Sequence, residues 1–260
     1  MRRFRYKTTM NLTPIQKLWI ASWQTLSVIL PKAIAQAAQI LFLTPERIPR
    51  PPSEIDYFNS AKKYKIDDRI AAFEWGLPHN PLVLLVHGWS GRGDSAGQIT
   101  HVGEYSQFMI DIQKTLGPYH AIIAHSFGAG CAVLSASRGL LVKKIVMVAG
   151  PSRYELVVTN YLDALKLSPK AREHFLNSLG ERVKLPVADM NVGVIGNKLS
   201  HLKAMVVHDI EDKEVTVRAA EDIKKNWPSI EIMMTTGLGH RRILKDPTVT
   251  AAVTEFILKT

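Results

Sequence analysis

Residues 121–132 read Ala-Ile-Ile-Ala-His-Ser-Phe-Gly-Ala-Gly-Cys-Ala, an apolar run followed by a serine and then by small residues. This order predicts a buried strand, a tight turn that carries Ser126, and a helix that begins at Phe127. Such a turn exposes the serine hydroxyl at a helix N-terminus, where it can act as a nucleophile. The full pattern is Gly-x-Ser-x-Gly, and Ala124 stands in place of the first glycine. Most serines in small-residue turns are only turn serines, so a catalytic role needs support from elsewhere in the chain.

The composition is that of a globular protein with a sizeable core. The chain has 260 residues, of which 46% are apolar, enough for one large α/β domain or two small ones and too many for a disordered chain. Its net charge of +10 raises the question of a nucleic-acid or anionic-lipid partner. The sequence has no basic motif interleaved with aromatic residues, and we therefore expect no nucleic-acid partner. The single cysteine, Cys131, excludes an intrachain disulfide framework and favours a cytoplasmic location.

The N-terminal part of the chain is basic at its start and apolar from about residue 18 to 43. Polar residues and Pro31 interrupt the apolar stretch, so it is too short to span a bilayer and predicts two amphipathic helices, at 13–29 and 31–42. We expect these helices to pack on the main body. Two alternatives remain open: helices that make weak contact with a membrane surface, and a cleaved export signal, because a basic flank is typical of both.

A proline-rich segment marks the clearest boundary in the sequence. It divides the chain into N-terminal helices with their linker, residues 1–52, and a main domain, residues 53–260. Within the main domain, residues 152–200 change character and predict a small helical insertion.

Strands and helices alternate through the rest of the main domain, which is typical of an α/β fold with a mostly parallel sheet. The predicted strands are short apolar runs, which is typical of a sheet that helices cover on both faces. A short hairpin precedes them. The hairpin is expected at 63–67 and 69–74, the sheet strands at 81–87, 120–125, 144–148, 203–208 and 230–235, and the helices at 102–116, 127–138, 153–166, 168–179, 215–226 and 247–258.

Two further loops that leave strand ends carry an acid and a base. Open α/β sheets place their sites at the carboxyl ends of strands, so Ser126, an acid within residues 208–215, and His240 are expected to meet there. A serine hydroxyl needs a base, and the base needs a carboxylate that fixes its tautomer. The backbone N–H groups of Phe127, directly after the serine, and of Trp89, in a glycine-rich loop after an earlier strand, are expected to form an oxyanion hole.

Taken in order, these motifs resemble the α/β-hydrolase superfamily, and in particular a group of bacterial serine hydrolases. The resemblance covers nearly the whole chain from about residue 40 onward. It implies an α/β-hydrolase-like, mostly parallel sheet, with the insertion at 152–200 forming a small cap that shapes an acyl pocket. The segments that carry it are residues 42–45, His87-Gly88-Trp89, Ala124-His125-Ser126-Phe127-Gly128, residues 209–215 and residues 237–244.

The same resemblance implies an activity and selects the acid. In such enzymes the acid usually precedes two residues and then a valine or isoleucine, which selects Asp212 because Val215 follows it, with Asp209 as the runner-up. The implied function is a serine hydrolase, most simply a carboxylesterase for small or medium acyl esters, with Ser126 as nucleophile and His240 as base. Neither a metal nor an organic cofactor is implied. A thioesterase, amidase or acyltransferase of the same fold, and a non-catalytic protein, remain the alternatives.

The chain departs from the family pattern between residues 88 and 119. Similar enzymes usually carry a helix, a strand and another helix there, whereas this stretch predicts one helix, 102–116, and no strand. We therefore expect one helix–strand unit to be missing. Either the hairpin then closes up against strand 81–87, or an edge of the sheet is left open, which invites a homodimer.

Four other polar residues flank the expected site. His87 and His125 are expected to orient or pack beside it rather than to act as bases. Arg241 and Arg242 are expected to form salt bridges or to direct the helix that follows; binding of an acidic substrate is the alternative.

Overall fold

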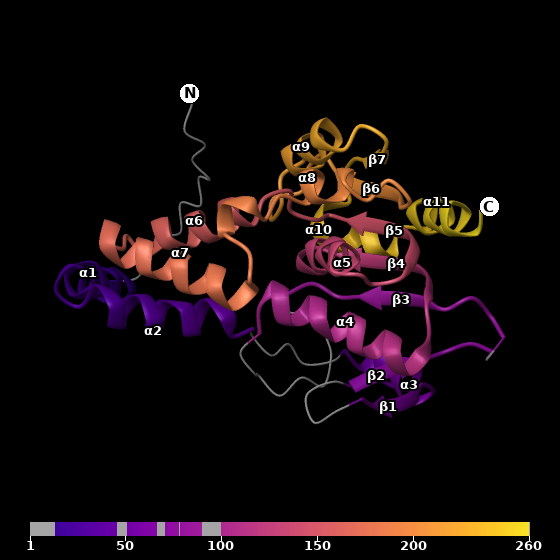
Figure 1. The fold of residues 1–260 in the computed structure, drawn as a ribbon, viewed down its shortest axis with the longest axis horizontal. Coiled ribbons are helices and arrows are strands. Elements are labelled where there is room, and N and C mark those ends of the chain that lie inside the picture. The colour runs from indigo at the N-terminus through magenta and orange to yellow at the C-terminus, as the bar shows by residue number, and fades with distance from the viewer. Residues whose placement is uncertain (1–13, 46–50, 67–70, 78, 90–99, 260) are drawn as a thin grey trace. The chain divides into compact units, whose positions relative to one another are not determined.

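The computed structural model describes residues 14–45, 51–66, 71–77, 79–89 and 100–259 (Figure 1). The chain divides into two compact units. One unit comprises residues 1–43 and 153–190, and the other comprises residues 44–152 and 191–260.

The first unit is helical. Its N-terminal helices are α1, Pro14–Ile29, and α2, Pro31–Leu43, close to the predicted bounds. Its later helices are α6, Tyr154–Ala164, and α7, Pro169–Val183, followed by a short 3₁₀ turn, Val187–Asp189. Among the described residues, no helix combines the length and the apolar character needed to cross a bilayer. The predicted domain boundary at residue 52 and the predicted cap limits stay predictions.

Specific contacts hold α1 and α2 to the helices from the later part of the chain. The Phe42 ring lies 4.9 Å from the Tyr161 ring and 5.7 Å from the Phe175 ring. The Ser168 side chain caps α7 and also donates a hydrogen bond to the backbone oxygen of Ser27, at 2.6 Å. Pro169 is the first residue of α7. Proline has no backbone N–H, but at this position the N–H would have no partner within the helix, so its absence costs no hydrogen bond.

The second unit is built on a parallel sheet of five strands, as predicted. They are β3, Val83–Val86; β4, Tyr119–His125; β5, Val142–Val148; β6, Lys203–Asp209; and β7, Glu231–Thr235. Their order across the sheet is the order in the chain, and every neighbouring pair is parallel. The carboxyl ends of all five therefore lie along one edge.

Helices cover the two faces of this sheet unequally. Right-handed crossovers between strands in chain order place all the connecting helices on one face. In agreement, neighbouring helices contact one another in the series α4, α5, α8, α9, and α5 packs on β4 and β5 (Figure 1). These helices are Val102–Leu116, Phe127–Ser137, Val192–Asn197 and Arg218–Asn226.

The last helix, α11, Pro247–Leu258, packs elsewhere on the sheet. Its buried residues Val253 and Phe256 share a core cluster with Ala121 and Val146 of the central strands. Successive strand residues point to opposite faces, so Ile122 and Ala124 face the other way. As predicted, Asp246 caps the helix, accepting a hydrogen bond from Val249 N–H at 3.0 Å.

The region predicted to be shortened connects β3 to β4. Its described part after the loop, residues 100–118, holds α4 and no strand, while residues 90–99 lie outside the described residues. The predicted hairpin forms as β1, Lys62–Lys65, and β2, Ala71–Glu74, but as a separate two-stranded sheet. It therefore does not close up against β3. Among the described strands β3 ends the five-stranded sheet, and the Leu85 side chain is 67% exposed.

Some short elements were not predicted. A 3₁₀ turn and a one-turn helix precede the hairpin, and short helices occupy the loops after β5 and β7. Their bounds are Pro52–Glu54, Ile55–Asn59 (α3), Val192–Asn197 (α8), Gly239–Arg242 (α10) and Ile243–Lys245.

Candidate active site

Ser126 occupies a strained turn between β4 and α5. Its φ is 53° and its ψ is −122°, a left-handed conformation that non-glycine residues rarely adopt. Two backbone hydrogen bonds hold it there: Ser126 N–H donates to Val148 O at 2.9 Å, and Ala129 N–H donates to Ser126 O at 3.0 Å. Strain of this kind persists only where surrounding structure enforces it, and it is concentrated at functional sites.

The loop after β3 lies directly against this turn. A Cβ added at Gly88 would lie 3.1 Å from the Ser126 Cβ, and one added at Gly128 would lie 2.6 Å from the His87 carbonyl oxygen. The Trp89 ring meets the Phe127 ring edge to face, with centroids 4.8 Å apart. The two residues predicted to supply oxyanion donors are therefore in contact. Phe127 is the first residue of α5, directly after Ser126.

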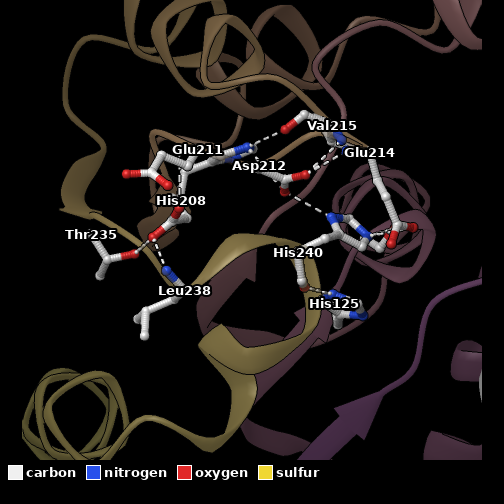
Figure 2. A network of polar contacts seen from close by, with 11 residues as sticks. His125, His208, Glu211, Asp212, Glu214, Val215, Thr235, Leu238 and His240 are labelled. Atoms are coloured by element: carbon white, nitrogen blue, oxygen red, sulfur yellow. Dashed lines mark hydrogen bonds and ion pairs between the residues drawn. The ribbon is translucent and has the colours of Figure 1, made fainter. Parts of the chain in front are cut away.

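His240 lies between Ser126 and Asp212. Its Nε2 is 3.0 Å from Ser126 Oγ, and its Nδ1 is 2.7 Å from Asp212 Oδ2. His240 and Asp212 are both buried, although they lie 28 residues apart on the loops after β7 and β6. The parallel strands bring them together because each loop leaves the same edge of the sheet (Figure 2).

Asp212 is held as an anion. Burial alone would raise the pKa of its carboxyl, but hydrogen bonds from His240 and from the backbone N–H groups of Val215 and Glu214 outweigh burial and hold it below the ordinary value. The two backbone donors lie 2.9 and 2.8 Å from Oδ1, which leaves Oδ2 to His240. A carboxylate so placed fixes the tautomer of His240 with the proton on Nδ1.

Asp209, the runner-up acid, lies in a different set of contacts. It is fully buried and accepts hydrogen bonds from Thr235 Oγ1 at 2.7 Å, Leu238 N–H at 3.0 Å and Glu211 N–H at 3.0 Å. Burial would raise the pKa of its carboxyl, but these bonds and one from Gly239 N–H lower it. Asp209 thus ties the end of β6 to the loop that carries His240.

Three further histidines surround the site, and burial lowers the pKa of each. His125 Nε2 donates to the His240 carbonyl oxygen at 2.9 Å, and the two rings lie 4.7 Å apart. His208 Nε2 donates to Val215 O at 2.8 Å and lies 3.7 Å from Asp212 Oδ2. His87 lies 2.9 Å from the Tyr105 hydroxyl. None of these three contacts Ser126 Oγ in the described structure, and they pack and orient their neighbours.

Glu214 is the residue of the site that the sequence did not identify. Its carboxylate lies 3.8 Å from His240 Nε2 and 3.2 Å from Arg241 Nε, at a side-chain exposure of 52%. Its position two residues after Asp212 was visible, but nothing in the pattern showed that its side chain turns toward His240. Arg242 instead donates to Gly237 O at 2.6 Å. Within the described ranges, no three His, Cys, Asp or Glu side chains are grouped as a metal site requires.

Comparison with known proteins identifies the fold. No family model matches the chain, and no curated protein matches it. Among solved structures, the carboxylesterase CesB (YbfK) from Bacillus subtilis has a TM-score of 0.54 at 13% identity, over 88% of this chain and 99% of that chain.

Two further solved structures agree. A serine hydrolase from Cycloclasticus zankles has a TM-score of 0.52 at 16% identity, over 76% of this chain and 97% of that chain. An α/β hydrolase from a lagoon-sediment metagenome has a TM-score of 0.51 at 13% identity, over 70% of this chain and 92% of that chain. At these identities the likeness establishes the fold alone, and this fold is that of the α/β hydrolases.

Proposed function

We propose that this protein is a serine hydrolase that cleaves carboxylic esters through an acyl-enzyme on Ser126. The observation that carries the proposal is the continuous contact from Asp212 through His240 to Ser126, at 2.7 and 3.0 Å. The serine of this series is also the residue in the strained turn. Chance contacts between buried polar groups do not require such a backbone, whereas a nucleophile presented at a helix N-terminus does.

In the first half of the reaction, His240 Nε2 accepts the proton of Ser126 Oγ as Oγ forms a bond to the ester carbonyl carbon. The carbonyl oxygen becomes an oxyanion, which accepts hydrogen bonds from the backbone N–H groups of Phe127 and Trp89. Asp212 accepts the Nδ1–H and stabilises the imidazolium. The bond to the alkoxy oxygen then breaks, and His240 gives its proton to the departing alcohol.

In the second half, a water molecule replaces the alcohol. His240 Nε2 takes a proton from the water as its oxygen attacks the acyl carbon, and the same N–H groups stabilise the second oxyanion. Ser126 Oγ leaves and recovers the proton from His240. The acid is released, and the protein returns to its starting state with no cofactor consumed.

Esters are the substrates best supported among the acyl compounds that this chemistry can cleave. The motifs from His87 to His240 resemble those of bacterial serine esterases, and a carboxylesterase and a serine hydrolase are among the solved structures that share the fold. We propose small and medium acyl chains. Thioesters and amides are the competing substrates, and both would use the same three side chains.

A substrate panel tests this function. Purified protein is assayed with p-nitrophenyl esters of two to twelve acyl carbons and with matched thioesters and anilides. We expect the highest kcat/KM on the shorter esters and a loss of about 10⁴-fold or more in Ser126→Ala. The matched control is Ser137→Ala, which removes a serine of the same helix whose hydroxyl bonds to Leu134 O. Hydrolysis that survives in Ser126→Ala, or a preference for anilides, would contradict the proposal.

A further inference from the structure

Helices α1 and α2 and the bend between them leave several large aliphatic residues exposed. Six large aliphatic residues of this segment are 41–68% exposed. Single exposed apolar residues are normal on a protein surface, whereas a group of them marks an interaction site. Four of them lie within residues 26–30, at the end of α1 and the bend before Pro31, and the other two are neighbours near the end of α2. We call this set the outer face; it consists of Leu26, Val28, Ile29, Leu30, Ile40 and Leu41.

The buried positions of the same helices include polar residues. Ser27 is fully buried, and its hydroxyl accepts a hydrogen bond from Ser168 N–H at 2.9 Å. Gln39 is also buried; it donates to Phe175 O at 3.3 Å and accepts from Arg182 Nε at 2.9 Å. Docking on the neighbouring helices therefore uses these polar groups together with the ring of Phe42 and the buried Leu43, while six large aliphatic residues remain exposed. The solvent side of a surface helix is usually polar, so the exposed aliphatic set is the unusual feature.

The charge of the same part of the chain identifies the kind of partner. Residues 1–45 contain six lysines and arginines and no aspartate or glutamate. One of the six, Lys32, is exposed on α2 one turn from Ile29. A second copy of this chain would bring like charges together on both sides of a contact. A surface of anionic lipid headgroups over an acyl layer would instead satisfy both the positive charge and the outer face.

We propose that α1 and α2 dock this protein on anionic membranes, with the outer face inserted at the boundary between headgroups and acyl chains. The helices lie in the plane of the interface, because no described helix is long and apolar enough to span it. The proposal does not depend on the activity of Ser126. It adds a location for the protein at a lipid surface, whatever ester it cleaves.

Vesicle co-sedimentation of the full chain tests the proposal. Wild type is mixed at 0.15 M salt with vesicles of phosphatidylcholine alone or with about 30% phosphatidylglycerol. We expect binding to the anionic vesicles and little binding to the neutral ones. Ile29→Asp should weaken the partition coefficient by about tenfold. Its control is Leu141→Asp, which places the same charge at a leucine that is 66% exposed in the other unit.

A charge pair separates electrostatic attraction from apolar insertion. Lys32→Glu should weaken binding to anionic vesicles by at least about fivefold. Lys143→Glu changes the net charge equally, at an exposed position on β5, and should leave binding unchanged. The proposal is overturned if wild type fails to bind anionic vesicles, or if Ile29→Asp and Leu141→Asp bind equally. It is also overturned if Ile29→Asp abolishes a dimer in solution while vesicle binding persists, since a second copy would then occupy the outer face.

Discussion

At the scale of single residues, the site depends on two buried carboxylates that lie three positions apart and meet different partners. Asp212 contacts His240, whereas Asp209 contacts Thr235 and the backbone of the His240 loop. Both are buried and both have a lowered pKa, so neither burial nor charge distinguishes them. Only the hydrogen-bond partners do: Asp212 contacts the proposed base, and Asp209 contacts the loop that carries it.

Asp212→Asn should impair catalysis with little effect on folding. The amide cannot stabilise an imidazolium as a carboxylate does, and it can favour the wrong tautomer of His240. We expect kcat on a short ester to fall by about 10³–10⁴-fold, with KM changed only slightly. Steady-state kinetics measures both, and circular dichroism confirms that the variant is folded.

Asp209→Asn provides the comparison and should mainly affect stability. It weakens charge-assisted bonds from four donors, so we expect the free energy of unfolding to fall by about 2–3 kcal/mol. Below its unfolding temperature the variant should keep kcat within about tenfold of wild type. If Asp209→Asn loses catalysis while Asp212→Asn retains it, the assignment of the acid is reversed.

Acid should destabilise the protein through the same two carboxyls. Each has a pKa in the folded state below its ordinary value. Their contribution is therefore present above the unfolded pKa, about 3.9, and is lost as pH falls through the lower folded values. Urea unfolding at several pH values from 6 to 3 should show a smaller loss in Asp209→Asn than in wild type. Parallel curves for the two proteins would contradict a depressed pKa at Asp209.

At the scale of elements, two glycines allow the β3 loop and the β4–α5 turn to touch. Gly128→Ala would place a Cβ 2.6 Å from the His87 carbonyl oxygen, so the loop that carries Trp89 must move. We expect kcat to fall at least about tenfold and stability to fall by about 2 kcal/mol. Gly180→Ala in α7 is the control, because its Cβ would meet neighbours at an ordinary 3.5 Å. Unchanged kinetics in Gly128→Ala would argue against a role for this loop.

The elements predicted best are those with strong local signals. Helix α4 has the predicted bounds because its apolar residues repeat at helical spacing and a Gly-Pro pair ends it. Helix α11 begins after the predicted Asp246 cap. The one-turn helices α3, α8 and α10 were missed, because a helix of four to six residues carries too few residues to show a period. Their bounds depend on packing rather than on local sequence.

The site was predictable to the level of its loops but not of its contacts. Strand ends in chain order brought Ser126, His240 and the loop 208–215 together. The resemblance selects Asp212 over Asp209 as the acid, and in the structure Asp212 is the one of the two that contacts His240. The side-chain direction of Glu214 was not predictable, because it depends on how a polar loop folds over a site formed by distant segments.

At the scale of the whole molecule, β3 is an edge strand of the five-stranded sheet that the described strands form. The predicted homodimer stays a prediction, and Leu85, 67% exposed on β3, tests it. An open edge strand can pair with the same strand of a second copy. Sedimentation velocity should show a dimer that grows with concentration, and Leu85→Lys should shift it toward monomer. Leu141→Lys is the matched control, and a wild type that is monomeric throughout would refute the dimer.

The central claim is that Ser126 is a nucleophile activated by His240. The most direct measurement is treatment of the folded protein with a fluorophosphonate, followed by mass spectrometry of the intact chain and its peptides. The account predicts one adduct per chain, on the peptide that contains Ser126, and almost none in Ser126→Ala or His240→Ala. An adduct on another residue, or equal labelling of Ser126→Ala, would contradict it.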